Sequence, residues 1–188
     1  MPEPSSRRPV AAILAVGIGL AAIVLLFLLF VPLGPSDQSP DSVVVGGHPL
    51  VGQPAPEIDL PTLDGRQVTL SGLRGRPVLI NFWATWCIPC RDEFPLMAAA
   101  YEEHAADGLE ILGIVHDDAP EGARDFAAEM GATWPLLLDG DDVAWHDYAG
   151  VGMPTSFFVD ADGVIRAFSF GGFSEDGLAA QLKTILPR

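Results

Sequence analysis

The chain contains only two cysteines, Cys87 and Cys90, and they stand two residues apart in the stretch "WCIPC". A zinc site needs four ligands, and the sequence offers no further cysteine and no histidine at zinc-finger spacing. A structural cross-link over so short a loop stabilises a fold little, because the gain grows with the length of the closed loop. The pair therefore favours reversible thiol–disulfide chemistry, with metal handling as the alternative.

The residues around the pair predict a strand that ends just before it and a helix that begins at it. Residues 78–84 (VLINFWA) are almost continuously apolar, as in a strand buried on both faces. Phe94 and Met97 start an apolar stripe with helical spacing, and Gly108 is a suitable end for that helix. Cys87 would then lie at the carboxyl end of a strand and at a helix N-terminus, whose partial positive charge stabilises a thiolate.

Further strands and helices alternate along the domain. The expected ranges are 57–70 for a first strand pair, 109–115 and 135–139 for single strands, 123–130 and 143–148 for helices, and 155–170 for a hairpin. Ser174 caps a final helix. This alternation predicts an α/β fold, with a mixed central sheet and helices on both of its faces.

Residues 10–31 form an uncharged, apolar span before this domain. A helix over the span would reach about 33 Å, which is enough to cross a bilayer. A cleaved signal peptide is the competing interpretation, but its apolar region is usually only about 7–15 residues long and ends at an A-x-A pattern that is missing here. We therefore expect one transmembrane signal-anchor helix.

The flanking charges predict the orientation of this helix. Arg7 and Arg8 precede it, and the positive-inside rule then leaves residues 1–9 in the cytoplasm. Residues 32–50 are rich in proline and glycine, which is typical of a linker. Residues 51–188 would form a domain outside the cell membrane, where cysteines can form disulfides.

The composition is strongly acidic, with 25 Asp and Glu against 10 Lys and Arg and a formal net charge of −15. Such a surface repels phosphate backbones, which argues against nucleic-acid binding. It suits solubility and basic protein partners.

The stretches "VLINFWATWCIPCRDEFP" and "GMPTSFFVDADGVIRAFSFG" together resemble the thioredoxin superfamily. They are most similar to its membrane-anchored, extracytoplasmic bacterial branch of TlpA, ResA and CcmG (DsbE) type proteins, over residues 51–187. The resemblance implies a thioredoxin-like fold. It also implies that Cys87 is the nucleophile and that Cys90, which is more buried, is the resolving thiol, acting through a mixed disulfide with the client.

The resemblance extends to residues that would bind the client. The peptide bond between Met153 and Pro154 would be cis and would lie against the cysteines. The backbone at Met153, together with Thr155, would bind an extended client segment by strand-like hydrogen bonds. Trp86 would line the contact surface.

One position departs from thioredoxin itself, which has a buried aspartate where this chain has Asn81. The membrane-anchored branch instead carries an acid after the second cysteine, a place that Glu93 occupies. The resemblance implies that Glu93, half buried beside Cys90, has a raised pKa and moves the proton of the Cys90 thiol. The structural alternative is a carboxylate that stabilises the first turn of the helix.

A second polar stretch, residues 116–118, ends a strand at the same sheet edge as Cys87. We expect a solvated loop there. The alternatives are that these residues border the client groove or bind a cation. A peroxiredoxin site is not indicated, because Ala84 stands three residues before Cys87 where such a site needs Thr or Ser.

The resemblance predicts a membrane-anchored, extracytoplasmic protein disulfide reductase. Its clients would be proteins with cysteine pairs, apocytochrome c among them, and its electrons would come from a membrane thiol donor of CcdA or DsbD type. Neither an organic cofactor nor a bound metal is expected. The alternatives are a disulfide oxidase of the same fold and a copper metallochaperone, although copper chaperones space their cysteines C-x-x-x-C and add a distant histidine.

Overall fold

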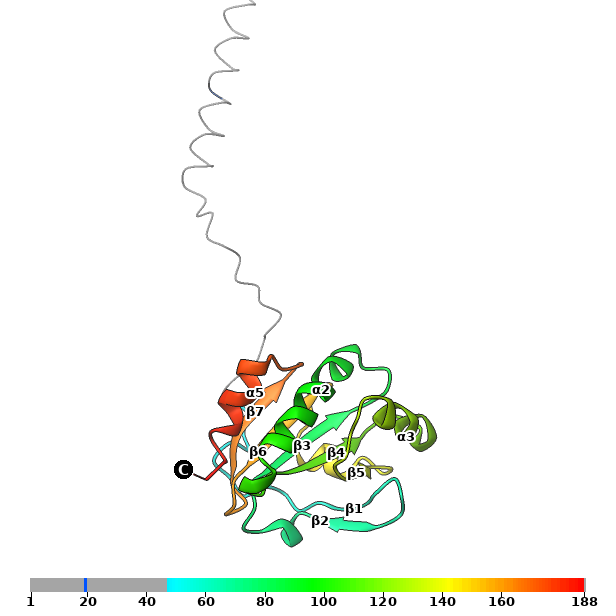
Figure 1. Cartoon of the computed structure of the whole chain (residues 1–188), viewed down its shortest axis with the longest axis horizontal. Coiled ribbons are helices and arrows are strands. Elements are labelled where there is room, and N and C mark those ends of the chain that lie inside the picture. Colours follow the sequence, from blue (N-terminus) through cyan, green and yellow to red (C-terminus); the bar gives the residue numbers. More distant parts are fainter. Residues whose placement is uncertain (1–18, 20–46, 188) are drawn as a thin grey trace, which may run out of the picture. The chain divides into compact units, whose positions relative to one another are not determined.

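A computed structural model describes residues 19 and 47–187 of the chain (Figure 1). Within residues 47–187 the strands are β1 (Asp59–Pro61), β2 (Gln67–Thr69), β3 (Val78–Trp83), β4 (Glu110–Val115), β5 (Leu136–Leu138), β6 (Thr155–Val159) and β7 (Ile165–Phe170). The helices are α2 (Ile88–Glu103), α3 (Pro120–Glu129), α4 (Val143–Asp147) and α5 (Glu175–Leu182). This order matches the alternation that the sequence predicts.

The central sheet is mixed, as expected. Its five strands lie in the order β5-β4-β3-β6-β7, and β1 and β2 form a separate antiparallel pair. Strands β3, β4 and β5 run parallel, whereas β6 is antiparallel to both β3 and β7. The α/β fold with a mixed sheet is therefore confirmed.

The two faces of this sheet pack against different elements. The face that carries Leu79 and Trp83 of β3 packs against α2, α3 and α5 around Phe94. The face that carries Ile80 and Phe82 packs against α4 and the segment that contains β1 and β2. Every residue of β3 is buried, which is why its sequence is apolar almost throughout.

Helix α2 is shorter than the sequence predicts. It ends at Glu103, and a single 3-10 turn over Ala105–Asp107 separates it from Gly108. The ring of His104 lies 2.9 Å from the Asp107 carboxylate, and this contact stabilises the tighter turn. Gly108 ends that turn in the left-handed conformation, with φ 76°.

The predicted membrane helix at residues 10–31 lies outside the described residues, apart from residue 19. Among the residues that the structure does describe, no helix combines the length and the apolar character that crossing a bilayer requires.

Candidate active site

The two cysteines lie where strand β3 leads into helix α2. Cys87 is the N-cap of α2, and its Sγ accepts a hydrogen bond from the backbone N–H of Cys90 at 3.2 Å. The two sulfurs form a disulfide. The expected position of the pair at a strand end and a helix N-terminus is thus observed.

Both sulfurs belong to buried residues, but their neighbours are exposed. Cys87 is 4% exposed and Cys90 is 0% exposed, so Cys87 is the more accessible of the two by only a small margin. Trp86 and Ile88, which flank Cys87, are 58% and 76% exposed. An apolar rim formed by these two side chains therefore borders the disulfide, as is typical of a surface that binds other proteins.

The loop after β4 holds the approach to this motif in place. The indole Nε1 of Trp86 donates to the backbone carbonyl of Asp117 at 3.1 Å. The backbone N–H of Thr85 donates to the carboxylate of Asp118 at 2.5 Å, and that of Ala119 does so at 2.7 Å. Residues 116–118 are therefore more than the solvated loop we expected, because they fix the position of Trp86.

These hydrogen bonds also determine the charge of Asp118. Partial burial acts to raise the pKa of its carboxyl, but the hydrogen bonds from Thr85 and Ala119 outweigh burial and leave that pKa below its usual value. The ionised side chain is thus the form that holds the loop.

The predicted client-binding loop lies against the same core cluster as the cysteines. The Met153–Pro154 peptide bond is cis, as expected. Met153 packs against the cluster that contains both cysteines. Thr155 is buried, and its hydroxyl donates to the carbonyl of Gly152 at 2.5 Å, so this side chain stabilises the loop.

A second contact brings this region to the start of α2. The backbone N–H of Gly171 donates to the carbonyl of Pro154 at 3.0 Å. At the next residue, Gly172, a Cβ would lie 3.3 Å from the carbonyl oxygen of Pro89, between the two cysteines. The small glycine therefore allows the loop after β7 to approach the cysteine motif closely.

Glu93 is more buried than the sequence suggests. It is 0% exposed, not half buried, and it lies one helical turn after Cys90 on the buried side of α2. Burial raises the pKa of its carboxyl to about 8, and the Asn81 amide and the backbone of Phe173 oppose this shift. The raised pKa agrees with the direction expected for Glu93.

Ser156 was not foreseen at this site. The side-chain amide of Asn81 donates to Glu93 Oε1 at 2.8 Å and to Ser156 Oγ at 2.9 Å. The signal available in the sequence was a polar residue, Ser156, directly before the apolar residues of the stretch "TSFFV". Sequence alone could not pair it with Asn81, because the two residues are 75 positions apart.

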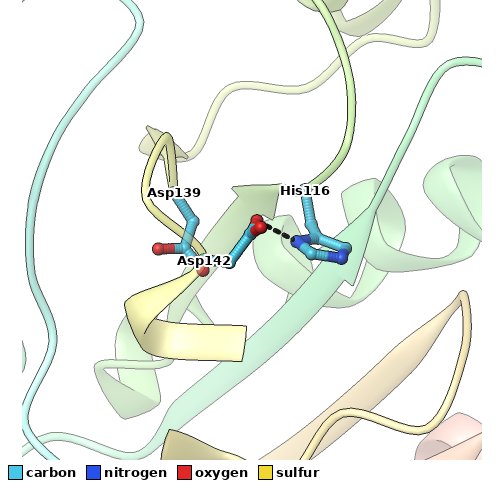
Figure 2. Close-up of side chains that lie close together, drawn as sticks. All are labelled: His116, Asp139 and Asp142. Carbon is cyan, nitrogen blue, oxygen red and sulfur yellow. Dashed lines mark ion pairs between the residues drawn. The ribbon is translucent and has the colours of Figure 1, made fainter. Parts of the chain in front are cut away.

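Figure 2 shows a second group of titratable side chains, His116, Asp139 and Asp142, whose ligand atoms lie within 4.8 Å of one another. His116 Nδ1 and Asp142 Oδ1 are 3.0 Å apart, and the His116 ring stacks on Trp145 with centroids 4.2 Å apart. Asp139 accepts the backbone N–H groups of Ala144 and Trp145 at 3.2 and 2.8 Å. Asp139 thus holds the start of α4, and the contact between His116 and Asp142 joins that helix to the loop after β4. Neither aspartate was singled out from the sequence.

Comparison with known proteins gives a matching family and relatives that are similar in sequence over most of the chain. A model of the AhpC/TSA family matches residues 51–168. Thiol-disulfide oxidoreductase ResA of Geobacillus thermodenitrificans is 35% identical over 138 residues, which cover 73% of this chain and 79% of that protein. ResA of Bacillus subtilis is 31% identical over 136 residues, which cover 72% of this chain and 76% of that protein.

A solved structure supports the same relationship. The thiol:disulfide interchange protein of the thioredoxin family from Chlorobium tepidum aligns with a TM-score of 0.65 and 29% identity. The alignment covers 71% of this chain and 96% of that one. The resemblance to ResA-type proteins and the thioredoxin-like fold are thereby confirmed. The chain belongs to the AhpC/TSA family of thioredoxin-fold proteins.

Proposed function

We propose that this thiol–disulfide oxidoreductase reduces disulfides in other proteins, outside the bacterial cell membrane to which residues 10–31 anchor it. The observation that carries the proposal is the Cys87–Cys90 disulfide at the N-terminus of α2, beneath an exposed apolar rim. The ResA relatives, named thiol-disulfide oxidoreductases, support the class of reaction.

The reaction begins from the dithiol form. The Cys87 thiolate attacks one sulfur of the client disulfide, and the other client sulfur leaves as a thiolate that takes a proton from water. Cys90 then gives its proton to Glu93 and attacks the Cys87 sulfur of the mixed disulfide. The second client sulfur leaves as a thiolate that takes the proton from Glu93, so the client gains two electrons and two protons while the protein is oxidised to the Cys87–Cys90 disulfide.

The helix supplies two of the groups that this sequence of steps needs. The N-terminus of α2 stabilises negative charge on Cys87, the residue that caps it. Glu93 would act as base and acid for Cys90, since a carboxyl whose pKa is about 8 titrates close to an ordinary thiol. Proton transfer between two groups of similar pKa costs little free energy in either direction.

The client surface would consist of Trp86, Ile88 and the Met153–Thr155 segment. Trp86 and Ile88 are exposed beside Cys87, and Met153 packs against the cluster that holds both cysteines. An extended client segment would pair with the backbone at Met153. Apocytochrome c is the client we favour, with a membrane thiol donor of CcdA or DsbD type returning the disulfide to the dithiol.

Trapping tests the proposal directly. A Cys90→Ala variant of the full chain lacks the resolving thiol, so it should accumulate mixed disulfides with its clients in the cell. The Cys87→Ala variant is the matched control and should trap none. Mass spectrometry of the trapped proteins identifies the clients. If cytochrome c precursors are missing from them, the role in cytochrome maturation is wrong, whereas trapping of other proteins leaves the reductase activity intact.

Two further measurements separate the alternatives. A reduction potential well above that of the glutathione pool would favour a disulfide oxidase. Tight, stoichiometric copper binding by the reduced protein, lost in Cys87→Ser, would favour the copper metallochaperone. Labelling of the reduced cysteines in intact cells by a maleimide that cannot cross membranes tests the extracytoplasmic location.

A further inference from the structure

A row of buried polar residues crosses the central sheet. Asn81 on β3 pairs in register with Ser156 on β6, and Ser156 pairs with Ser169 on β7. The three residues are 0%, 1% and 1% exposed. Because directly paired residues project to the same face, all three lie on the face that carries Trp83 and packs against α2. Burial of polar groups is costly unless they are hydrogen-bonded, so this row requires a physical reason.

The contacts of the row lead to Glu93. Asn81 uses both hydrogens of its side-chain amide, one toward Glu93 Oε1 at 2.8 Å and one toward Ser156 Oγ at 2.9 Å. Two buried acceptors, Asn81 Oδ1 and Glu93 Oε2, form no hydrogen bond of normal geometry within the described residues. The N–H donors of the Asn81 amide are thus used, while the amide oxygen has no hydrogen-bond partner among the described residues.

This orientation favours the ionised form of Glu93. A carboxylate accepts hydrogen bonds at both oxygens, whereas a protonated carboxyl accepts fewer and must also donate one. The amide of Asn81 presents an N–H donor to Glu93, so it stabilises the carboxylate more than the neutral acid. The Ser156 hydroxyl accepts the second hydrogen of the amide and so holds the amide in this orientation.

An asparagine is well suited to this place. An ionised aspartate would offer acceptors only and would repel an ionised Glu93. A leucine of similar size would offer nothing to either form of the carboxyl. Asn81, held by Ser156, donates to the Glu93 carboxylate without adding a charge to the buried site.

We infer that Asn81 is a positioning residue for thiol–disulfide exchange: its amide, held by Ser156, orients the Glu93 carboxyl and stabilises the carboxylate that takes the proton of Cys90. The inference rests on the role of Glu93 in the proposed function. In this step the proton passes from Cys90 Sγ to the Glu93 carboxylate, and Asn81 neither gains nor loses a proton.

The other groups that face Glu93 do not orient its carboxyl in this way. Cys90 lies one turn before it on α2, and Phe173 faces it through its backbone. No charged side chain of the described residues acts on its carboxyl. The titration of Glu93 therefore depends on burial and on its hydrogen bonds, and Asn81 is the side chain that supplies one.

The test replaces Asn81 by Leu in the full chain and measures the resolving step. The reduced protein reacts with the aromatic disulfide 5,5′-dithiobis(2-nitrobenzoate), and Cys90 then releases the second thionitrobenzoate from Cys87. Loss of the hydrogen bond to the ionised carboxyl should move the pH midpoint of that release upward by about one pH unit. Carbon-13 NMR of the Glu93 carboxyl should report the same shift in the absence of any substrate.

Ser169→Ala is the matched control, because Ser169 belongs to the same row but its hydroxyl forms no hydrogen bond within the described residues. It should leave the midpoint unchanged. If Asn81→Leu does not fold, Ser156→Ala keeps the amide but removes its support, and it should move the midpoint upward by a smaller amount.

The Glu93→Gln variant separates the two levels of the argument. If its release keeps the midpoint of the unmodified protein, the proposed role of Glu93 is wrong and the inference about Asn81 falls with it. If Glu93→Gln removes the midpoint while Asn81→Leu and Ser156→Ala leave it in place, the inference is overturned and the proposed function stands.

Discussion

Cys90 and Glu93 lie three residues apart on one helix, and both are fully buried. Burial in this position has opposite consequences for structure and for chemistry. It destabilises an ionised carboxylate, which costs free energy of folding. It also raises the pKa of Glu93 to about 8, close to that of a thiol, which is what a proton exchange with Cys90 needs.

The free energy of unfolding should record this cost. The folded protein keeps the Glu93 proton up to about pH 8, whereas the unfolded chain loses it near the ordinary pKa of 4.5. The folded state therefore binds more protons between these values, and stability falls as the pH rises through this window. Glu93→Gln, which cannot ionise, should be more stable than the unmodified protein by about 5 kcal/mol above pH 8 and nearly equal below pH 4.

Urea denaturation of the oxidised protein at pH 4 and pH 9 measures this difference. Glu103→Gln is the control, because Glu103 is exposed near the end of the same helix. It should show no such dependence on pH. Equal stabilisation by Glu93→Gln at both pH values would contradict the raised pKa of the buried carboxyl.

At the scale of the elements, the site depends on a loop that carries no cysteine. The segment after β4 binds the residues just before Cys87, through the Asp118 carboxylate and the Asp117 carbonyl. On its other side His116 contacts Asp142 (Figure 2). The His116 ring also stacks on Trp145. The loop thus connects α4, on one face of the sheet, with the approach to the cysteines.

Removal of the Asp118 carboxylate should loosen this approach. Asp118→Ala leaves the Thr85 and Ala119 N–H groups without their acceptor, so we expect a loss of about 1–3 kcal/mol in the free energy of unfolding. Trp86 would become more mobile, and reduction of insulin by the variant should be slower.

Asp117→Asn is the control for this prediction. Residue 117 has φ 52°, which asparagine tolerates, and its backbone carbonyl is the group that binds Trp86. Urea denaturation and insulin turbidity should therefore change little. Equal losses in both variants would mean that the charge of the loop matters and the Asp118 hydrogen bonds do not.

The whole molecule is an acidic protein with its reactive disulfide at one edge of the sheet. The formal net charge is −15, a charge that would attract basic clients at long range. The rim at the disulfide itself is apolar, with Trp86 and Ile88 exposed. Charge should therefore govern how often clients arrive, and the apolar rim should govern how they bind.

Salt dependence tests this division. A lysine-rich peptide disulfide should be reduced about ten times faster than a glutamate-rich one of the same core sequence at low ionic strength. The difference should disappear at roughly 0.5 M NaCl, where charges are screened over a few ångströms. A preference that persists at high salt would place the discrimination in short-range contacts at the rim.

The sequence by itself determined the order of the elements and the place of the cysteine motif. These are local properties. Apolar periodicity within residues 78–84 and along the following helix predicts a strand and a helix, and Cys87 must then lie between them. The Ser174 cap was equally readable, and its hydroxyl accepts the Gly177 N–H at 3.1 Å.

Only the tertiary structure decided what surrounds the reactive groups. Three features depend on hydrogen bonds between residues that are 12 to 75 positions apart. They are the surroundings of the buried Glu93, the bond from Asn81 to Ser156, and the bond from the Thr85 N–H to Asp118. Such contacts depend on strand register and on how α2 packs on the sheet, and neither leaves a periodic trace in the sequence. The end of α2 at Glu103 is likewise not encoded by periodicity, and a side-chain contact between His104 and Asp107 lies in the turn that follows it.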